Sequence, residues 1–326
     1  MWTKILILFA LTACVTPEDK GLVANRRLAE AASKRGDWPV AAELWHRVYF
    51  SEGFKDPRAC LETARALHLL GDPESAEALL ASGLQRFPES FALMEYHGVT
   101  LEATGYRRAA ESAYANALAL QSDLVLSLIG LGRVRLALGL PGSAVQPLRR
   151  LVELDPSSEA LRFLSEAARA TKNFVLAYDS YLHLFDVGSG SVSELVNAAS
   201  VGLESSLRAE RRAAPLVCEA WLKRALEVDP QRTRAHMLLG AYRELAGDDE
   251  AAVSHLSRAC ETDPACAEAY LDIAELHIRM SERETARSFL NHARKLVDTK
   301  STRARFEALE ASAEEPVAEE PVPEAD

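Results

Sequence analysis

Hydrophobic positions recur along most of the chain at spacings of three and four residues, which is the period of an amphipathic helix. Between about residues 22 and 298 these helical stretches come in pairs. The first helix of a pair runs to a glycine, a few turn residues follow, and the second helix ends at a proline. Glycine allows the left-handed conformation that ends many helices, and proline cannot continue a helix. The pattern predicts an all-α protein built from helix pairs.

The marks that separate these pairs have a fixed spacing. A spacing of 34 residues separates Gly71 from Gly105, Gly105 from Gly139, and Pro230 from Pro264. A constant period of this length indicates a repeat architecture, in which each unit buries its apolar side against its neighbours.

The layout resembles the tetratricopeptide repeat (TPR), a 34-residue pair of antiparallel helices. Stretches such as RVRLALGLPGSAVQPLRRLVELDP (133–156) and YRELAGDDEAAVSHLSRACETDP (242–264) carry the resemblance. Small residues fill the eighth position as Ala29, Ala64, Gly98, Gly132, Gly240 and Ala274, and the twentieth as Ala41, Ala76, Ala110, Ala144, Ala252 and Ala286. The resemblance implies an α-solenoid over 22–298, a right-handed superhelix of about eight antiparallel helix pairs. The units start near Leu22, Pro57, Phe91, Val125, Glu159, Ser191, Thr233 and Ala267.

Two units depart from the repeat pattern. The fifth has Glu166 at the small position and Asn173 at the glycine position, and is one residue short. The sixth has a surplus around 202–221, so we expect a longer helix pair there. Residues 299–313 read as a capping helix, because a terminal repeat needs a polar outer face. Residues 314–326 are acidic and proline-rich, and we expect this tail to be disordered.

The N-terminus predicts a membrane anchor rather than a membrane span. The apolar run 5–11 is far shorter than the roughly 20 residues of a spanning helix. A charged start, a short apolar core and small residues read as a secretory signal, here residues 1–13. Leu11-Thr12-Ala13-Cys14 resembles the lipobox of bacterial lipoproteins, which implies cleavage before Cys14 and its acylation, with 14–21 as a lipidated tether. After this cleavage, Val15 would be the second residue of the mature chain. A residue other than aspartate at this position resembles the sorting signal of outer-membrane lipoproteins in enterobacteria, although the sorting rule varies between bacteria.

In the TPR family, the first helix of each unit lines a groove that binds a peptide or a partner's helix. The family pattern places groove-facing residues at positions two, five and nine. It gives an apolar strip of Leu61, Val99, Ile129 and Phe163, flanked by Arg58, Arg65 and Arg133. Ala160 and Ala167 are projected onto the same face. Such a strip suits an amphipathic segment with some acidic residues, while each residue taken singly is an ordinary half-exposed helix residue.

The remaining chemistry points away from catalysis. The chain has eight histidines but no HExxH, CxxC, glycine-rich phosphate loop or GxSxG motif. We therefore expect no enzyme, no cofactor and no metal. Cys260 and Cys266 flank one inter-repeat turn in a compartment expected to be oxidising, so a disulfide between them is a candidate, although spacing alone does not establish connectivity. The net charge is −11; without the six acids of residues 314–326 and the lysine of residues 1–13 it is −6, and this mild acidity argues against nucleic acid as the partner.

The predicted function is a non-enzymatic scaffold for protein partners, lipid-anchored at the periplasmic face of a bacterial outer membrane. The combination of anchor and repeats resembles the pilus-biogenesis lipoproteins that help secretin pores assemble, and the TPR lipoproteins of tight-adherence secretion. Two alternatives remain open at this stage. One is a regulator or enzyme of cell-wall remodelling, and the other is a surface-displayed binding lipoprotein.

Overall fold

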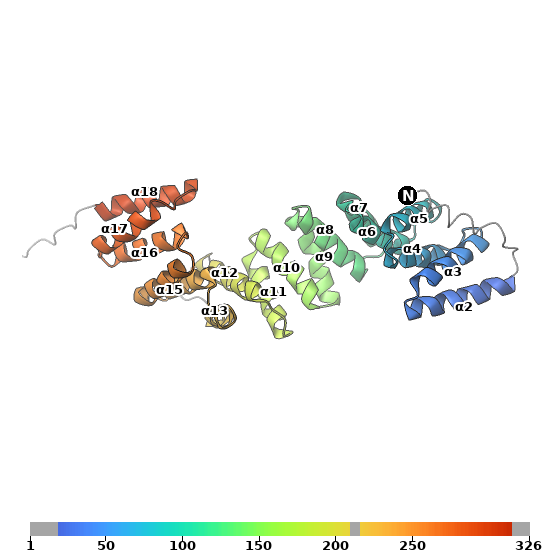
Figure 1. Ribbon diagram of the computed structural model, residues 1–326, viewed down its shortest axis with the longest axis horizontal. Coiled ribbons are helices and arrows are strands. Elements are labelled where there is room, and N and C mark those ends of the chain that lie inside the picture. Colours follow the sequence, from blue (N-terminus) through green and yellow to red (C-terminus); the bar gives the residue numbers. More distant parts are fainter. Residues whose placement is uncertain (1–18, 209–215, 315–326) are drawn as a thin grey trace, which may run out of the picture. The chain divides into compact units, whose positions relative to one another are not determined.

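The computed structural model describes residues 19–208 and 216–314, and within these ranges it contains seventeen helices and no strand (Figure 1). The first nine are α2 (Asp19–Arg35), α3 (Trp38–Ser51), α4 (Pro57–Leu69), α5 (Pro73–Arg86), α6 (Phe91–Ala103), α7 (Arg107–Leu120), α8 (Val125–Ala137), α9 (Pro141–Leu154) and α10 (Ser158–Ala170). The others are α11 (Phe174–Asp186), α12 (Val192–Arg208), α13 (Leu216–Val228), α14 (Thr233–Leu245), α15 (Asp249–Thr262), α16 (Ala267–Arg279), α17 (Arg283–Ala293) and α18 (Lys300–Glu314). The all-α prediction is confirmed.

Seven pairs of consecutive helices pack on each other, namely α2/α3, α4/α5, α6/α7, α8/α9, α12/α13, α14/α15 and α16/α17, and α18 follows them. In chain order, α10 and α11 make up the fifth of eight repeats. The chain divides into two compact units between Thr171 and Lys172. Unit 1 contains the first four repeats and α10, and unit 2 contains α11, the last three repeats and α18. Within each unit, consecutive helices pack on one another in the manner of a solenoid. The division falls inside the fifth repeat, one of the two whose sequences depart from the pattern.

The turn within the third repeat shows how the sequence ends one helix and starts the next. After α6, Gly105 adopts a left-handed φ of 87°. This conformation lets the Tyr106 N–H donate to the Leu101 carbonyl at 2.8 Å, which satisfies an acceptor left open at the helix end. The chain then reverses, and α7 begins at Arg107.

The small residues lie where the two helices of a repeat meet, as predicted. Ala64, Ala76, Ala110 and Ala144 are fully buried. At Gly132 an added Cβ would lie 2.3 Å from the Leu148 side chain, so a larger residue there would require Leu148 or one of the two helices to move.

Unit 2 contains a longer first helix and the cap. The first helix of the sixth repeat, α12, has 17 residues, whereas α14 and α16 have 13. At the end, α18 packs on α16 and α17 through the buried Phe306, and Arg305 forms an ion pair with Asp272 at 2.6 Å. Among the described residues, no helix combines the length and the apolarity that a membrane crossing requires.

Candidate functional site

The first helices of unit 1 form one continuous face. Helices α4, α6, α8 and α10 each contact the next one along this face. Leu61 on α4, Val99 on α6 and Ile129 on α8 are partly exposed there. Val99 also packs against the core residues on both sides of it, so its exposed part is held by a rigid base. Leu126, at the second position of α8, is 40% exposed and extends the apolar area.

The expected register of α10 is wrong by one residue. Ala160 and Ala167, projected onto the groove, are fully buried. The pattern of buried residues shows that Ser158 corresponds to the first residue of α8. The shift arises because only three residues connect α9 to α10, whereas four connect α7 to α8. Phe163 therefore takes the sixth position and is partly buried. The positions two, five and nine of α10 belong to Glu159, Arg162 and Glu166, which are exposed.

The same shift explains the unusual residues of the fifth repeat. Its small position is occupied by the buried Ser165, and Glu166 is exposed. The left-handed residue of its turn is Lys172, with a φ of 58°. Asn173 follows as the cap of α11, and its side chain accepts a hydrogen bond from the Leu176 N–H at 3.2 Å.

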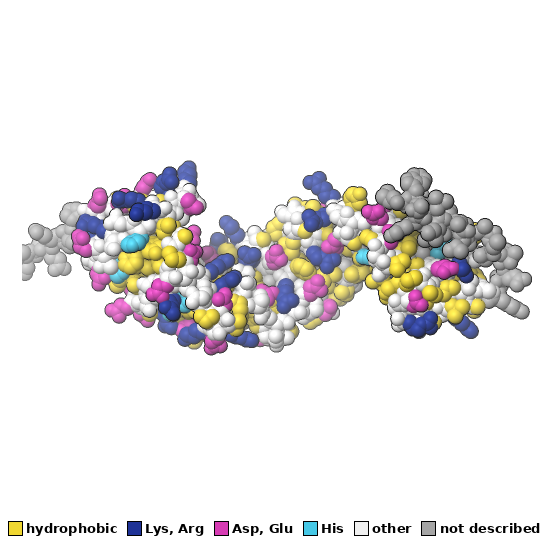
Figure 2. Space-filling model, in the orientation of Figure 1, with side chains coloured by type: hydrophobic (Ala, Val, Ile, Leu, Met, Phe, Trp, Pro, Cys, Tyr) yellow, Lys and Arg dark blue, Asp and Glu magenta, His cyan; other side chains and the backbone are white. Residues whose placement is uncertain are grey.

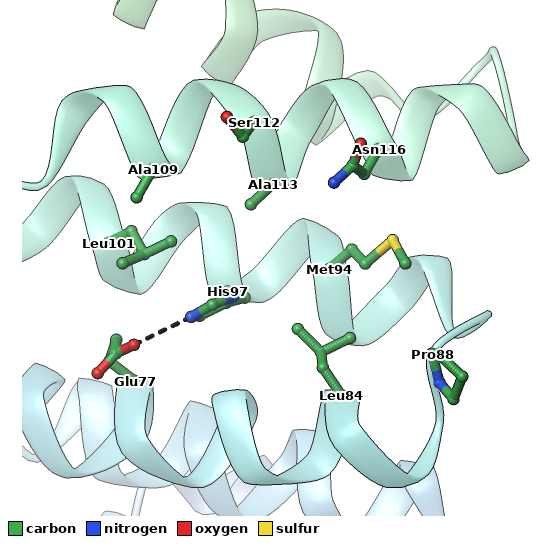
Figure 3. Close-up of a pocket in the computed structure, with 10 residues that line it drawn as sticks. All are labelled: Glu77, Leu84, Pro88, Met94, His97, Leu101, Ala109, Ser112, Ala113 and Asn116. Atoms are coloured by element: carbon green, nitrogen blue, oxygen red, sulfur yellow. Dashed lines mark hydrogen bonds and ion pairs between the residues drawn. The ribbon is translucent and has the colours of Figure 1, made fainter.

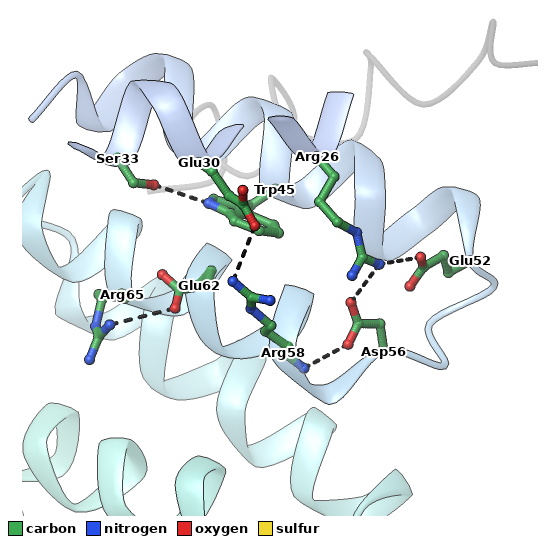
Figure 4. A network of polar contacts seen from close by, with 9 residues as sticks. All are labelled: Arg26, Glu30, Ser33, Trp45, Glu52, Asp56, Arg58, Glu62 and Arg65. Atoms are coloured by element: carbon green, nitrogen blue, oxygen red, sulfur yellow. Dashed lines mark hydrogen bonds and ion pairs between the residues drawn. The ribbon is translucent and has the colours of Figure 1, made fainter. Parts of the chain in front are cut away.

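The two arginines of α4 are already paired within the protein (Figure 4). Arg58 lies 3.1 Å from the Glu30 carboxylate, which projects from α2. Arg65 lies 3.5 Å from Glu62, and its guanidinium is 5.5 Å from the centre of the Tyr96 ring. These contacts neutralise the charge that the sequence appeared to offer to an acidic partner. A new carboxylate would have to compete with an existing one.

Arg133 on α8 is held in the same way. Its Nε and Nη2 donate to the two oxygens of Glu102 on α6, at 2.7 and 2.9 Å. The Tyr114 hydroxyl donates to Glu102 as well, at 3.2 Å. The bidentate hydrogen bonds raise the pKa of Arg133 further, and burial together with Glu102 raises the pKa of Tyr114. All three groups tie neighbouring repeats together.

A second link between α6 and α8 uses Glu95. Its Oε1 accepts hydrogen bonds from the backbone N–H and the hydroxyl of Ser127, both at 3.0 Å. Ser127 lies in the first turn of α8, where a carboxylate is favoured by the helix dipole. Glu95 lies at the same repeat position as Leu61 and Ile129, but its carboxylate is bound to Ser127 within the protein.

A pocket of about 630 Å³ opens on the other side of α6, between α5 and α7 (Figure 3). Its lining residues are Glu77, Leu84, Pro88, Met94, His97, Leu101, Ala109, Ser112, Ala113 and Asn116. The His97 Nε2 lies 3.1 Å from the Glu77 carboxylate at one end. Apolar walls with one polar pair fit an apolar side chain that carries a hydrogen-bonding group.

The sequence analysis missed this pocket, although a signal was present. The repeat position that Ala113 occupies in α7 holds larger side chains in other second helices, namely Leu79, Pro147, His255 and Phe289. Ala109 precedes Ala113 by one helical turn, so two small side chains lie one above the other on one face. A local lack of side-chain volume on that face opens the pocket.

The remaining candidate residues lie in unit 2 or outside the described ranges. Cys260 and Cys266 are free thiols in the structure, and the Cys266 Sγ lies 3.5 Å from the Met237 Sδ. Their disulfide stays a prediction. Cys14 lies outside the described residues. Within residues 19–208 and 216–314, no group of three metal-ligating side chains converges.

Comparisons with known proteins identify the repeats. A family model described as Tetratricopeptide repeat matches residues 26–91, 97–159, 129–185 and 219–265, which together make up more than half of the chain. No curated protein matches the sequence.

Solved structures share the fold at low sequence identity. One is the C-terminal part of a TPR repeat-containing protein from Cytophaga hutchinsonii, with a TM-score of 0.52, 15% identity, and coverage of 76% of this chain and 98% of that one. Another is the pilF protein of Pseudomonas aeruginosa, with a TM-score of 0.50, 14% identity, and coverage of 71% and 98%. At these identities the likeness concerns the fold. The chain belongs to the tetratricopeptide repeat family.

Proposed function

We propose that this protein is a non-enzymatic scaffold that binds a segment of a partner protein along the first-helix face of unit 1. Tetratricopeptide repeat proteins act as protein-interaction scaffolds. The observation that carries the proposal is the row of partly exposed apolar side chains Leu61, Val99 and Ile129 on three adjacent first helices. Leu61 and Val99 pack against core residues, so little conformational entropy is lost when a partner covers them.

The chemistry of this face favours an amphipathic partner segment whose apolar side provides most of the binding energy. Arg58 and Arg133 have carboxylates of the protein itself as partners. A partner that carries acidic residues gains little from them, because each existing pair must first be broken. We therefore expect binding to depend weakly on salt, unlike binding through free charges. In Figure 2, acidic and basic side chains are interspersed with hydrophobic ones over the visible face.

We further propose that the scaffold is anchored through acylated Cys14 at the periplasmic face of a bacterial outer membrane. There it would help to assemble an envelope complex such as a type IV pilus with its secretin, or a related secretion system. The support is the lipobox-like Leu11-Thr12-Ala13-Cys14, followed directly by the repeats. The pilF structure has the same fold, which is compatible with this setting.

Site-specific photo-crosslinking in cells tests the proposal. A photoreactive phenylalanine analogue replaces Leu61 or Ile129 on the first-helix face. In matched controls it replaces Ser82 or Gln146, which are exposed on the second helices α5 and α9 of the same unit. We expect one envelope protein to crosslink from Leu61 and Ile129 and not from the two controls. Equal adducts from all four positions, or none from the first helices, would refute binding at this face.

Anchoring is tested separately by fractionation. After a high-salt wash, the unaltered chain is expected to stay in the outer-membrane fraction, and the Cys14→Ser chain is expected to be released from it. Recovery of the unaltered chain as a soluble protein would exclude the anchor while leaving the crosslinking result interpretable.

A further inference from the structure

The outer face of α2 is unusual in its composition. With a turn of about 100° per residue, Val23, Ala24, Arg27, Leu28, Ala31, Lys34 and Arg35 share one arc of the helix. Among residues 21–35, this arc contains three basic residues and no acidic one. Val23 and Leu28 are each 55% exposed, and Arg27, Lys34 and Arg35 are exposed as well. Because α2 is the first described helix, no earlier described helix covers this arc.

The charges of α2 are sorted between its two sides. Arg26 and Glu30 point toward the following helices, where Arg26 pairs with Asp56 at 3.0 Å and Glu30 pairs with Arg58 at 3.1 Å (Figure 4). In contrast, no carboxylate among the described residues forms an ion pair with Arg27, Lys34 or Arg35. The unpaired positive charge of α2 is therefore concentrated on its outer face.

A role in helix stability explains only part of this arrangement. Lys34 and Arg35 lie in the last turn of α2, where positive charge favourably opposes the helix dipole. Arg27 lies in the middle of the helix, beyond the range of that effect. The dipole also gives no reason for exposing Val23 and Leu28 beside it.

The position of α2 in the chain points to what covers this face. Its first residue, Asp19, is five residues after Cys14. At about 3.5 Å per residue, an extended chain of this length reaches roughly 17 Å. If Cys14 is acylated, the first residue of α2 cannot lie farther than about that distance from the bilayer surface, and a helix is itself about 10–12 Å across.

We propose that the outer face of α2 binds the surface of an anionic lipid bilayer, with Arg27, Lys34 and Arg35 against acidic headgroups and Val23 and Leu28 dipping between them. The proposal rests on the anchoring of Cys14 proposed above. The face complements an anionic surface in charge, and its two apolar side chains match the boundary between headgroups and acyl chains. The chain's net charge of −11 does not oppose this contact strongly, because charges farther away than the Debye length of about 8 Å are screened.

The size of the effect follows from the number of basic residues. Each one near an anionic membrane surface strengthens binding by about fivefold, so three of them contribute about 100-fold. Removing all three charges should therefore be readily visible. Removing three equally exposed charges elsewhere in unit 1 should change little.

Vesicle flotation of the chain from residue 14 onward, carrying Cys14→Ser, measures this contact without any lipid modification. The vesicles contain equal parts of phosphatidylglycerol and phosphatidylethanolamine. The test variant is R27Q/K34Q/R35Q, and the matched control is R107Q/R108Q/R149Q, which removes three exposed arginines from α7 and α9. We expect binding to weaken about 100-fold in the test variant and to stay unchanged in the control. Circular dichroism checks that both variants are folded.

The outcomes separate this proposal from the anchoring itself. Equal weakening in both variants, equal binding to pure phosphatidylcholine vesicles, or no binding by the parent chain would overturn the role of α2. Stronger capture by soluble polyglutamate than by the vesicles would do the same, because it would indicate an acidic protein as the partner. None of these results affects the fractionation test of Cys14, because the high-salt wash in that test screens the contact between the basic residues and the headgroups and leaves acylation to hold the chain.

Discussion

Gly130→Ala offers a demanding test of the packing between repeats. Tyr114 on α7 is fully buried, and its ring lies between the backbones of α6 and α8, against Gly98 and Gly130. A Cβ at Gly130 would lie 2.4 Å from the Tyr114 Cζ and 2.6 Å from its Cε2. These distances are far below van der Waals contact, so the ring or the helix must move.

Two opposite effects determine the magnitude. Overpacking of a well-filled core costs about 1–3 kcal/mol. Replacing glycine by alanine inside a helix contributes about 1 kcal/mol of stability. The net expectation for Gly130→Ala is a loss of up to about 2 kcal/mol. In a Tyr114→Ala background the clash disappears and only the helix term remains, so the same substitution should then stabilise by about 1 kcal/mol.

Peptide-resolved amide hydrogen exchange is the suitable assay, because a repeat array need not unfold in a single step. Exchange in α6, α7 and α8 should quicken in Gly130→Ala. Gly142→Ala is the control, because the nearest atom to its added Cβ is the Thr171 methyl carbon at 4.0 Å. A stabilising effect of Gly130→Ala in the otherwise unaltered chain, or the same destabilisation with and without Tyr114, would refute the reasoning.

Three further changes test other parts of the structure. Phe306→Ala should cost about 3 kcal/mol locally, seen as faster amide exchange in α18 while α14 is unaffected. Burial lowers the pKa of His46 from its ordinary value of 6.5, so the unfolded chain binds more protons and stability falls as the pH drops below about 6.5. Urea midpoints of unit 1 should decline between about pH 7.5 and about pH 5.5, and His46→Leu should flatten this decline. If Cys260 and Cys266 form a disulfide, protein purified from the periplasm without reductant should have an intact mass two hydrogens below that of the reduced protein. Complete alkylation of both thiols after denaturation would exclude the disulfide.

The repeat architecture was predictable because its signals are local and recur. Gly71, Gly105 and Gly139 end first helices at a constant spacing, and Ala76 and Ala110 mark the helix contacts in phase with them. Each mark has its own physical reason, and agreement among independent marks identifies the fold. The pairing of the helices follows from the short turns between them.

The details of the interaction face were less accessible, because they depend on connection lengths and on distant partners. A single residue missing between α9 and α10 moved Phe163 out of the expected register. The carboxylate that pairs with Arg133 belongs to Glu102, 31 residues earlier in the chain. No local pattern indicates such a pair. The pocket beside α6 depends on side-chain volume that is absent at Ala113, which a search for motifs does not detect.

Hydrogen exchange of the anchored chain in isolated envelopes, compared with the purified chain, tests the central claim most directly. If the first-helix face of unit 1 holds a partner, peptides from α4, α6 and α8 should be protected in the envelope sample, and peptides from α5, α7 and α9 should exchange as they do in the purified protein. Protection of the second helices alone, or identical exchange in the two samples, would contradict this account.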